Sequence, residues 1–162
     1  MIKSILASVL LAAAATTAQA QSVIFGAGYA DFSNSDSDDL AIFSLEYQHK
    51  PFHQATRFGA TWGAALSVDE DGNTHIGAGL IGIYSLSDRW FVEGSVMPGY
   101  FNASDNDNDL GGEFQIRSLL GLGYTLDSGN KVSMAITHKS NASTQDDNPG
   151  VNTLLLRYHY AF

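Results

Sequence analysis

The last eleven residues of the chain, NTLLLRYHYAF at 152–162, place apolar side chains at every second position. These apolar positions are Leu154, Leu156, Tyr158, Tyr160 and Phe162. The positions between them include Thr153, Arg157 and His159. Successive side chains of a β-strand point to opposite sides of a sheet, so this period of two predicts a strand with one apolar and one mainly polar face.

The same period recurs along the rest of the chain toward its N-terminus. It is found in seven further segments, at residues 23–32, 40–48, 56–68, 74–86, 90–101, 113–125 and 131–140. Many of them are near the roughly 9–11 residues that a tilted strand needs to cross a bilayer. Glycine is frequent on the faces opposite the apolar ones, which suits a narrow interior where backbones approach closely. The sequence therefore predicts an all-β chain of eight strands.

The acidic residues separate two kinds of connection between these segments. One kind is short or carries few acids, near residues 48–55, 87–89 and 127–130. The other kind holds 13 of the 17 Asp and Glu residues, at 31–39, 69–73, 102–113 and 140–151. An up-and-down barrel with both termini on one side gathers these four connections at its opposite rim, which in outer-membrane barrels is the extracellular one.

We therefore predict an eight-stranded antiparallel up-and-down transmembrane β-barrel whose apolar faces meet lipid. Three features favour lipid outside: the Glu, Arg and His residues on the opposite faces, the even strand count, and the terminal Phe162. Alternation alone does not say which face is inside. A soluble periplasmic barrel or sandwich, with the apolar faces inward around an apolar ligand, is the alternative fold.

The first 20 residues have the composition of an export signal. Lys3 is followed by the apolar run 5–15, and Ala18-Gln19-Ala20 forms a small-residue cleavage site. We predict a signal peptide at 1–20 and an outer-membrane β-barrel domain at 21–162.

Charge and cysteine content exclude several classes of function. Lys3 is the only charged residue of the leader, so residues 21–162 carry seven basic and 17 acidic residues, a formal net charge of −10. A protein that binds nucleic acid needs a basic face to displace counterions from phosphates, so we expect no nucleic-acid partner. The chain has no Cys, which excludes disulfides, thiolate metal sites and a thiol nucleophile.

The region with candidate chemistry is ITHKSNASTQDDNPGVN at 136–152. His138 and Ser140 are two residues apart on a strand, so both side chains leave the same face, about 6.6–6.8 Å apart along the chain. A rotated imidazole can then reach the hydroxyl and act as its general base. His138 and Ser140 alternate in step with Met134 and Ile136, so their side chains point to the same face of the strand. This places the pair on the lipid-facing wall near the extracellular rim. A nucleophile in that position suits an ester substrate that is itself a lipid.

The string His138-Lys139-Ser140-Asn141-Ala142, followed by Asn148-Pro149-Gly150 and a final strand, resembles the outer-membrane lipid A 3-O-deacylases of the PagL type. The resemblance implies a serine esterase that removes the 3-O-linked hydroxyacyl chain of lipopolysaccharide in the outer leaflet of the bacterial outer membrane. It assigns the nucleophile to Ser140, the base to His138 and a contribution to the oxyanion hole to Asn141. It is also compatible with a homodimer.

One position departs from the family pattern. Where family members described as Ser-His-Glu triads carry the acid, this chain has Asn152. Asn152 points to the same face of the last strand as Leu154, so it can lie across the hairpin from His138 as the third member of a catalytic triad. An Asn can orient a His ring, but it cannot offset the charge of an imidazolium. Asp146 or Asp147 could supply that charge from the loop, although solvated rim residues are the simpler interpretation.

The remaining motifs give no cofactor. Asp105-Asn106-Asp107-Asn108-Asp109 resembles the start of a calcium loop, but Leu110 and Ile116 stand where an EF-hand needs Gly and Glu. We predict no metal and no cofactor for catalysis. The rival function is a non-catalytic outer-membrane barrel with acidic surface loops, serving as an adhesin or a structural element.

Overall fold

The computed structural model describes residues 21–30, 40–105 and 109–162. The predicted signal peptide at 1–20 lies outside the described residues, as do 31–39 and 106–108 of the acidic connections. The described strands are β1 (Ser22–Ala30), β2 (Leu40–Gln48), β3 (His53–Gln54), β4 (Phe58–Asp69), β5 (Thr74–Ser85), β6 (Trp90–Asn102), β7 (Phe114–Thr125), β8 (Lys131–Ser140) and β9 (Val151–Ala161). None of the described segments forms a helix long and apolar enough to cross a membrane.

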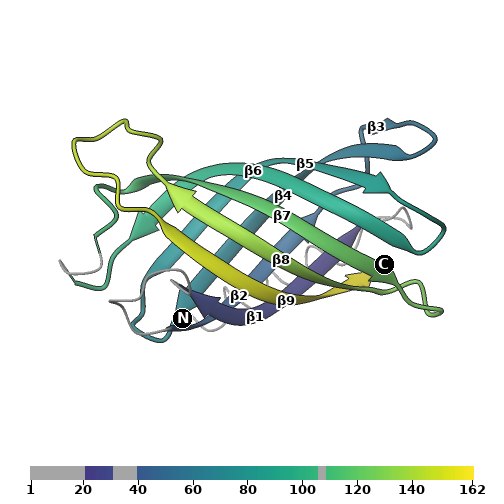
Figure 1. Ribbon diagram of the computed structural model, residues 1–162, viewed down its shortest axis with the longest axis horizontal. Helices are drawn as coiled ribbons and strands as arrows, with labels where there is room; N and C mark the ends of the chain where they lie inside the picture. Colours follow the sequence, from purple (N-terminus) through teal and green to yellow (C-terminus); the bar gives the residue numbers. More distant parts are fainter. Residues whose placement is uncertain (1–20, 31–39, 106–108) are drawn as a thin grey trace, which may run out of the picture.

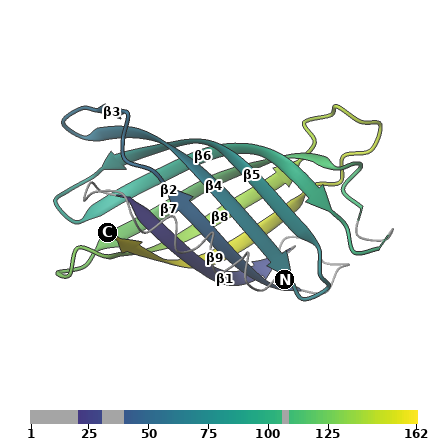
Figure 2. The same ribbon diagram turned by 180° about the vertical axis from the view of Figure 1, so that it is seen from behind.

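The strands form one antiparallel sheet that closes on itself (Figures 1 and 2). Each of the eight long strands is paired with the long strands that precede and follow it in the sequence, and the β1–β9 pairing completes the ring. The predicted eight-stranded up-and-down barrel is therefore confirmed. The structure adds β3, a two-residue strand that pairs with the start of β4 and is too short for its alternation to be recognised in the sequence.

The two faces of the barrel wall divide the side chains as the transmembrane prediction requires. Large apolar side chains are exposed on the outside of every long strand, and examples are Phe43 at 63%, Leu120 at 66% and Leu156 at 68%. The buried inward positions carry charged and polar groups, including Glu46, Glu93 and Arg157. The soluble alternative needs the reverse arrangement, and this structure contradicts it.

A network of ion pairs crosses the interior. Glu46 accepts hydrogen bonds from Arg117 at 2.7 Å and Arg157 at 2.9 Å, and Arg157 also pairs with Glu93 at 2.8 Å. The hydroxyl of Ser133 lies 2.8 Å from His159 Nε2 and joins the same group. These charges are removed from water, so each depends on its partners to offset the cost of desolvation.

The connections are sorted between the two ends of the barrel. The 69–74 and 140–151 connections gather at one end, together with the described parts of the connection between β6 and β7, residues 102–105 and 109–114. At the other end lie the 85–90 and 125–131 turns, β3 and the C-terminal end of β9 (Figure 1). By the usual orientation of outer-membrane barrels, the first end is extracellular and the second periplasmic.

The interior network gives a test of the fold. We expect Glu46→Gln to lower the free energy of unfolding by about 3–5 kcal/mol, because it leaves two buried guanidinium groups without their shared carboxylate. The measurement is urea unfolding in detergent micelles followed by tryptophan fluorescence. Asp127→Asn is the control, since it breaks the exposed Arg89–Asp127 pair of 2.6 Å and should change stability little. Equal effects of the two substitutions would contradict this account of the interior.

Candidate active site

The predicted site residues of β8 and β9 lie directly opposite each other across the last hairpin. His138 is the register partner of Asn152. The His138 Nδ1 and Asn152 Oδ1 atoms are 2.8 Å apart. An amide oxygen can only accept, so in this geometry Nδ1 carries the hydrogen and donates it. Nε2 then keeps its lone pair, which is the tautomer that a general base needs.

Ser140 ends β8, two residues beyond His138, and its side chain is half-buried beside Ile116 of β7. His138 is exposed and Lys139 between them is buried, so the pair shares the outer face as predicted. Within the described part of the chain, no hydrogen bond joins His138 to Ser140. Catalytic hydrogen bonds are often loose in unliganded enzymes and tighten when substrate binds.

A second hydroxyl, which sequence reasoning missed, lies on the other side of His138. Ser118 of β7 is the register partner of His138, and it is exposed on the same outer face. Directly opposed residues of antiparallel strands have Cβ atoms about 4.5–5.5 Å apart, so Ser118 is a rival neighbour of the imidazole. Only the strand register could have revealed it, because Ser118 and His138 belong to different segments of the sequence.

The chain turns sharply away from the barrel immediately after the motif. Ala142 and Ser143 have φ angles of 53° and 59°, a left-handed conformation that costs energy for residues other than Gly. The main-chain oxygen of Asn141 accepts hydrogen bonds from the Thr144 N–H at 3.1 Å and the Thr144 hydroxyl at 2.7 Å. The turn therefore ends β8 at Ser140 and leaves the hydroxyl at the rim.

Gly150 shapes the other side of the imidazole. It has a φ of +66°, and a Cβ atom added there would lie 3.1 Å from His138 Cε1 and 3.5 Å from Nε2. A larger residue would therefore be strained and would crowd the ring. Glycine at this position leaves room for the Cε1 and Nε2 atoms of His138.

Asn141 follows the last residue of β8 and is fully buried, between the connection after β8 and the connection between β6 and β7. Its Nδ2 donates to the main-chain oxygens of Leu110 at 3.4 Å, Gly111 at 3.2 Å and Asp147 at 2.6 Å. Its main-chain N–H donates to Asn148 Oδ1 at 3.0 Å. Asn141 thus ties the connection after β8 to the connection between β6 and β7.

The two loop carboxylates that the sequence offered as alternative acids, Asp146 and Asp147, are exposed on the connection after β8. The imidazole is instead hydrogen-bonded to Asn152.

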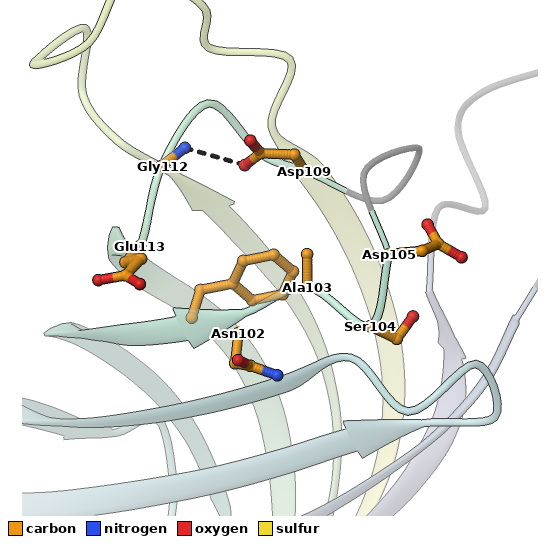
Figure 3. A pocket seen from close by; sticks show the side chains of 8 residues that line it. Asn102, Ala103, Ser104, Asp105, Asp109, Gly112 and Glu113 are labelled. Atoms are coloured by element: carbon orange, nitrogen blue, oxygen red, sulfur yellow. Dashed lines mark hydrogen bonds between the residues drawn. The ribbon is translucent and has the colours of Figure 1, made fainter.

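The outer rim also holds an acidic hollow, built by the connection between β6 and β7 (Figure 3). It has a volume of about 290 Å³ and is lined by residues that include Asp105, Asp109 and Glu113. Asp109 accepts a hydrogen bond of 3.0 Å from the Gly112 N–H (Figure 3). Among the described residues, no group of three or more His, Asp and Glu side chains is placed to hold a metal ion.

An apolar groove lies lower on the wall that carries His138 and Asn152. Its volume is about 560 Å³, and its outward side chains come from four adjacent strands: Phe25, Ala27, Phe43, Val132, Leu156 and Tyr158. The wall around the site is therefore suited to hydrocarbon, with polar groups only near its extracellular end.

Comparisons with known proteins agree with this geometry. The model of the family "Lipid A 3-O-deacylase (PagL)" matches residues 41–161. The curated protein "Lipid A deacylase PagL" of Bordetella bronchiseptica is 27% identical over 175 residues, covering 99% of this chain and 96% of the relative.

Solved structures with the same fold include the crystal structure of the outer membrane enzyme PagL, with a TM-score of 0.72 and 20% identity over 87% of this chain and 99% of that one. The attachment invasion locus protein Ail of Yersinia pestis has a TM-score of 0.56 and 14% identity over 90% of this chain and 100% of its own. At these identities the likeness shows the fold alone. The family model, however, spans most of the chain and includes both strands of the site, so this protein belongs to the lipid A 3-O-deacylase (PagL) family.

Proposed function

We propose that this protein hydrolyses the 3-O-linked hydroxyacyl ester of lipid A, from the outer leaflet of the outer membrane, with Ser140 as nucleophile and His138 as general base. The observation that carries the proposal is the hydrogen bond of 2.8 Å between His138 and Asn152 on the lipid-facing side of the barrel. A polar pair at that position faces hydrocarbon and headgroups, which is where the ester of a membrane lipid lies. The apolar groove lower on the same wall supports a lipid substrate.

The proposed reaction proceeds in two stages. The Ser140 oxygen attacks the ester carbonyl while His138 Nε2 takes its proton, and the sugar oxygen then leaves with that proton from His138. Water from the headgroup layer attacks the acyl-serine, gives a proton to His138, and the fatty acid is released as the proton returns to Ser140. No metal or cofactor takes part in this sequence.

Asn152 is proposed as the third member of the site. Its oxygen accepts the hydrogen of His138 Nδ1 and so holds the ring and its tautomer. A neutral amide stabilises the imidazolium less than a carboxylate does, which predicts a slower enzyme than a relative with an acid there.

For Asn141 we propose an indirect contribution to the oxyanion hole. Its Nδ2 already donates to main-chain oxygens, including those of Gly111 and Asp147, and its main-chain N–H donates to Asn148. These bonds hold the connection that follows Ser140, so Asn141 is a positioning residue that fixes the donors around the developing oxyanion.

The nucleophile is tested by mass spectrometry of lipid A after incubation with refolded protein. We expect Ser140→Ala to abolish the loss of one hydroxyacyl chain and His138→Gln to slow it about 10²–10⁴-fold, the usual contribution of a general base. Ser118→Ala is the matched control, because Ser118 is the other hydroxyl beside His138 and should be dispensable. Loss of activity in Ser118→Ala alone would move the nucleophile to β7. No release by the wild-type protein, with the barrel folded, would favour the non-catalytic barrel.

Substitution of Asn152 tests its role as the third member of the proposed catalytic site. A charge-assisted hydrogen bond is about 1–1.5 kcal/mol stronger than a neutral one, so Asn152→Glu should raise kcat about tenfold. Asn152→Ala should lower kcat, because the ring loses its partner. Both are measured as initial rates of fatty-acid release at saturating substrate. An unchanged rate in both variants would show that Asn152 has no part in the reaction.

Asn141→Ala separates positioning from direct catalysis. We expect lower kcat together with faster proteolytic cleavage within 142–149, because the connection loses its ties to Gly111 and Asp147. Lower kcat with unchanged cleavage would instead mark Asn141 as a direct oxyanion donor.

A further inference from the structure

The exposed positive charge of the described residues is confined to the periplasmic end of the barrel. The exposed cations there are Lys50, Arg57 and Arg89, whereas Arg117, Lys139 and Arg157 are buried inside. Arg89 is paired with Asp127 at 2.6 Å. Within the described ranges, Lys50 and Arg57 have no ion pair. Both belong to the connection 49–57, which contains no acidic residue.

This connection borders a groove on the lipid-facing wall. The groove has a volume of about 370 Å³ and lies between β2 and β4, with Tyr47, His49 and Trp62 as walls and Gly63 and Ala64 as floor. Because Ala64 is the register partner of Tyr47, a small residue sits beside a large one and leaves a depression. The lining is almost entirely apolar or aromatic, which suits a hydrocarbon chain.

The walls of the groove are held in place. The Tyr47 hydroxyl donates to Gln21 Oε1 at 3.1 Å and lies 3.0 Å from His49 Nδ1. The Trp62 ring packs on the Phe52 ring at a centroid distance of 5.5 Å. A preformed depression of this kind costs little ordering when it is filled.

The connection is also fixed to the barrel at the mouth of the groove. The His49 N–H donates to the Trp62 carbonyl at 2.8 Å, and the Thr61 hydroxyl donates to the main-chain oxygen of Lys50 at 3.1 Å. The main chain of Lys50 is thus held one residue beyond His49 of the groove, and its exposed side chain starts at the level where tyrosine and tryptophan mark the membrane interface. Arg57 lies further along the chain, in the turn of the β3–β4 hairpin, which the hydrogen bond of 2.7 Å from the Ala55 N–H to the Phe58 carbonyl closes.

We propose that this groove, with Lys50 and Arg57, is a binding site for a phospholipid with a net negative headgroup in the periplasmic leaflet. One acyl chain lies over Ala64 between Tyr47 and Trp62, and the headgroup phosphate meets the ammonium of Lys50. Arg57 adds attraction at longer range. The unpaired cations and the absence of acids in 49–57 select an anionic headgroup over a zwitterionic one. The inference requires only the barrel in a membrane and is independent of the esterase assignment.

The test uses the two tryptophans of the chain, Trp62 and Trp90, both exposed at the periplasmic end. Trp90→Phe leaves Trp62 as the reporter, and Trp62→Phe leaves Trp90 as a matched reporter outside the groove. Each protein is reconstituted in phosphatidylcholine vesicles containing the same fraction of brominated phosphatidylglycerol or brominated phosphatidylcholine. Bromine quenches tryptophan only at short range, so quenching reports which lipid occupies the groove.

We expect the lipid at Trp62 to be enriched in phosphatidylglycerol by about fivefold, because one basic residue near the surface attracts an anionic lipid by about that factor. Trp90 should show no preference, since Arg89 beside it is already paired. The preference at Trp62 should vanish in Lys50→Gln/Arg57→Gln, whose substitutions lie in an exposed connection and spare the barrel. Equal quenching of Trp62 by the two lipids would overturn the proposal. A preference that survives the double substitution would overturn the role of the two cations.

Discussion

Closure of the hydrogen-bonded sheet is the constraint on which the rest of this protein depends. Lipid offers no partner to an unpaired main-chain N–H or carbonyl, so a strand of this barrel cannot have a free edge inside a membrane. The β1–β9 and β2–β4 pairings remove the last two edges. Once the ring is closed, alternation leaves each residue only two directions, into the lumen or out toward lipid. The charged interior and the apolar exterior are both consequences of that geometry.

The same constraint decides where chemistry can be placed. Three side chains of the site point outward from their strands: His138, Ser140 and Asn152. The β8–β9 register sets His138 opposite Asn152. A slip of one residue would turn the imidazole into the lumen and bring Lys139 to the lipid face. The site therefore needs no pocket of its own. It is a short polar interruption in an apolar wall, and access to it is governed by the depth of the residues in the bilayer.

Much of this arrangement could be predicted from the sequence, because alternation is a local signal. The eight long strands, the direction of their apolar faces, and the interior position of Arg157 and His159 all follow from residues two apart. Alternation does not fix register, so Ser118 was not recognised as a neighbour of His138. The hydrogen bonds of Asn141 depend on how two distant connections meet, and β3 is too short to show a period. These features are set by tertiary contacts that no single segment contains.

The ion pairs inside the barrel have a consequence for permeability. Glu46, Arg117, Arg157 and Glu93 come from β2, β7, β9 and β6, so their side chains span the lumen from opposite walls. An eight-stranded barrel is only wide enough for its own side chains, and these are nearly inaccessible to water. Among the described residues, this layer of side chains fills the lumen and closes the axis to water. A cell can therefore carry many copies of this protein without opening its outer membrane to small solutes.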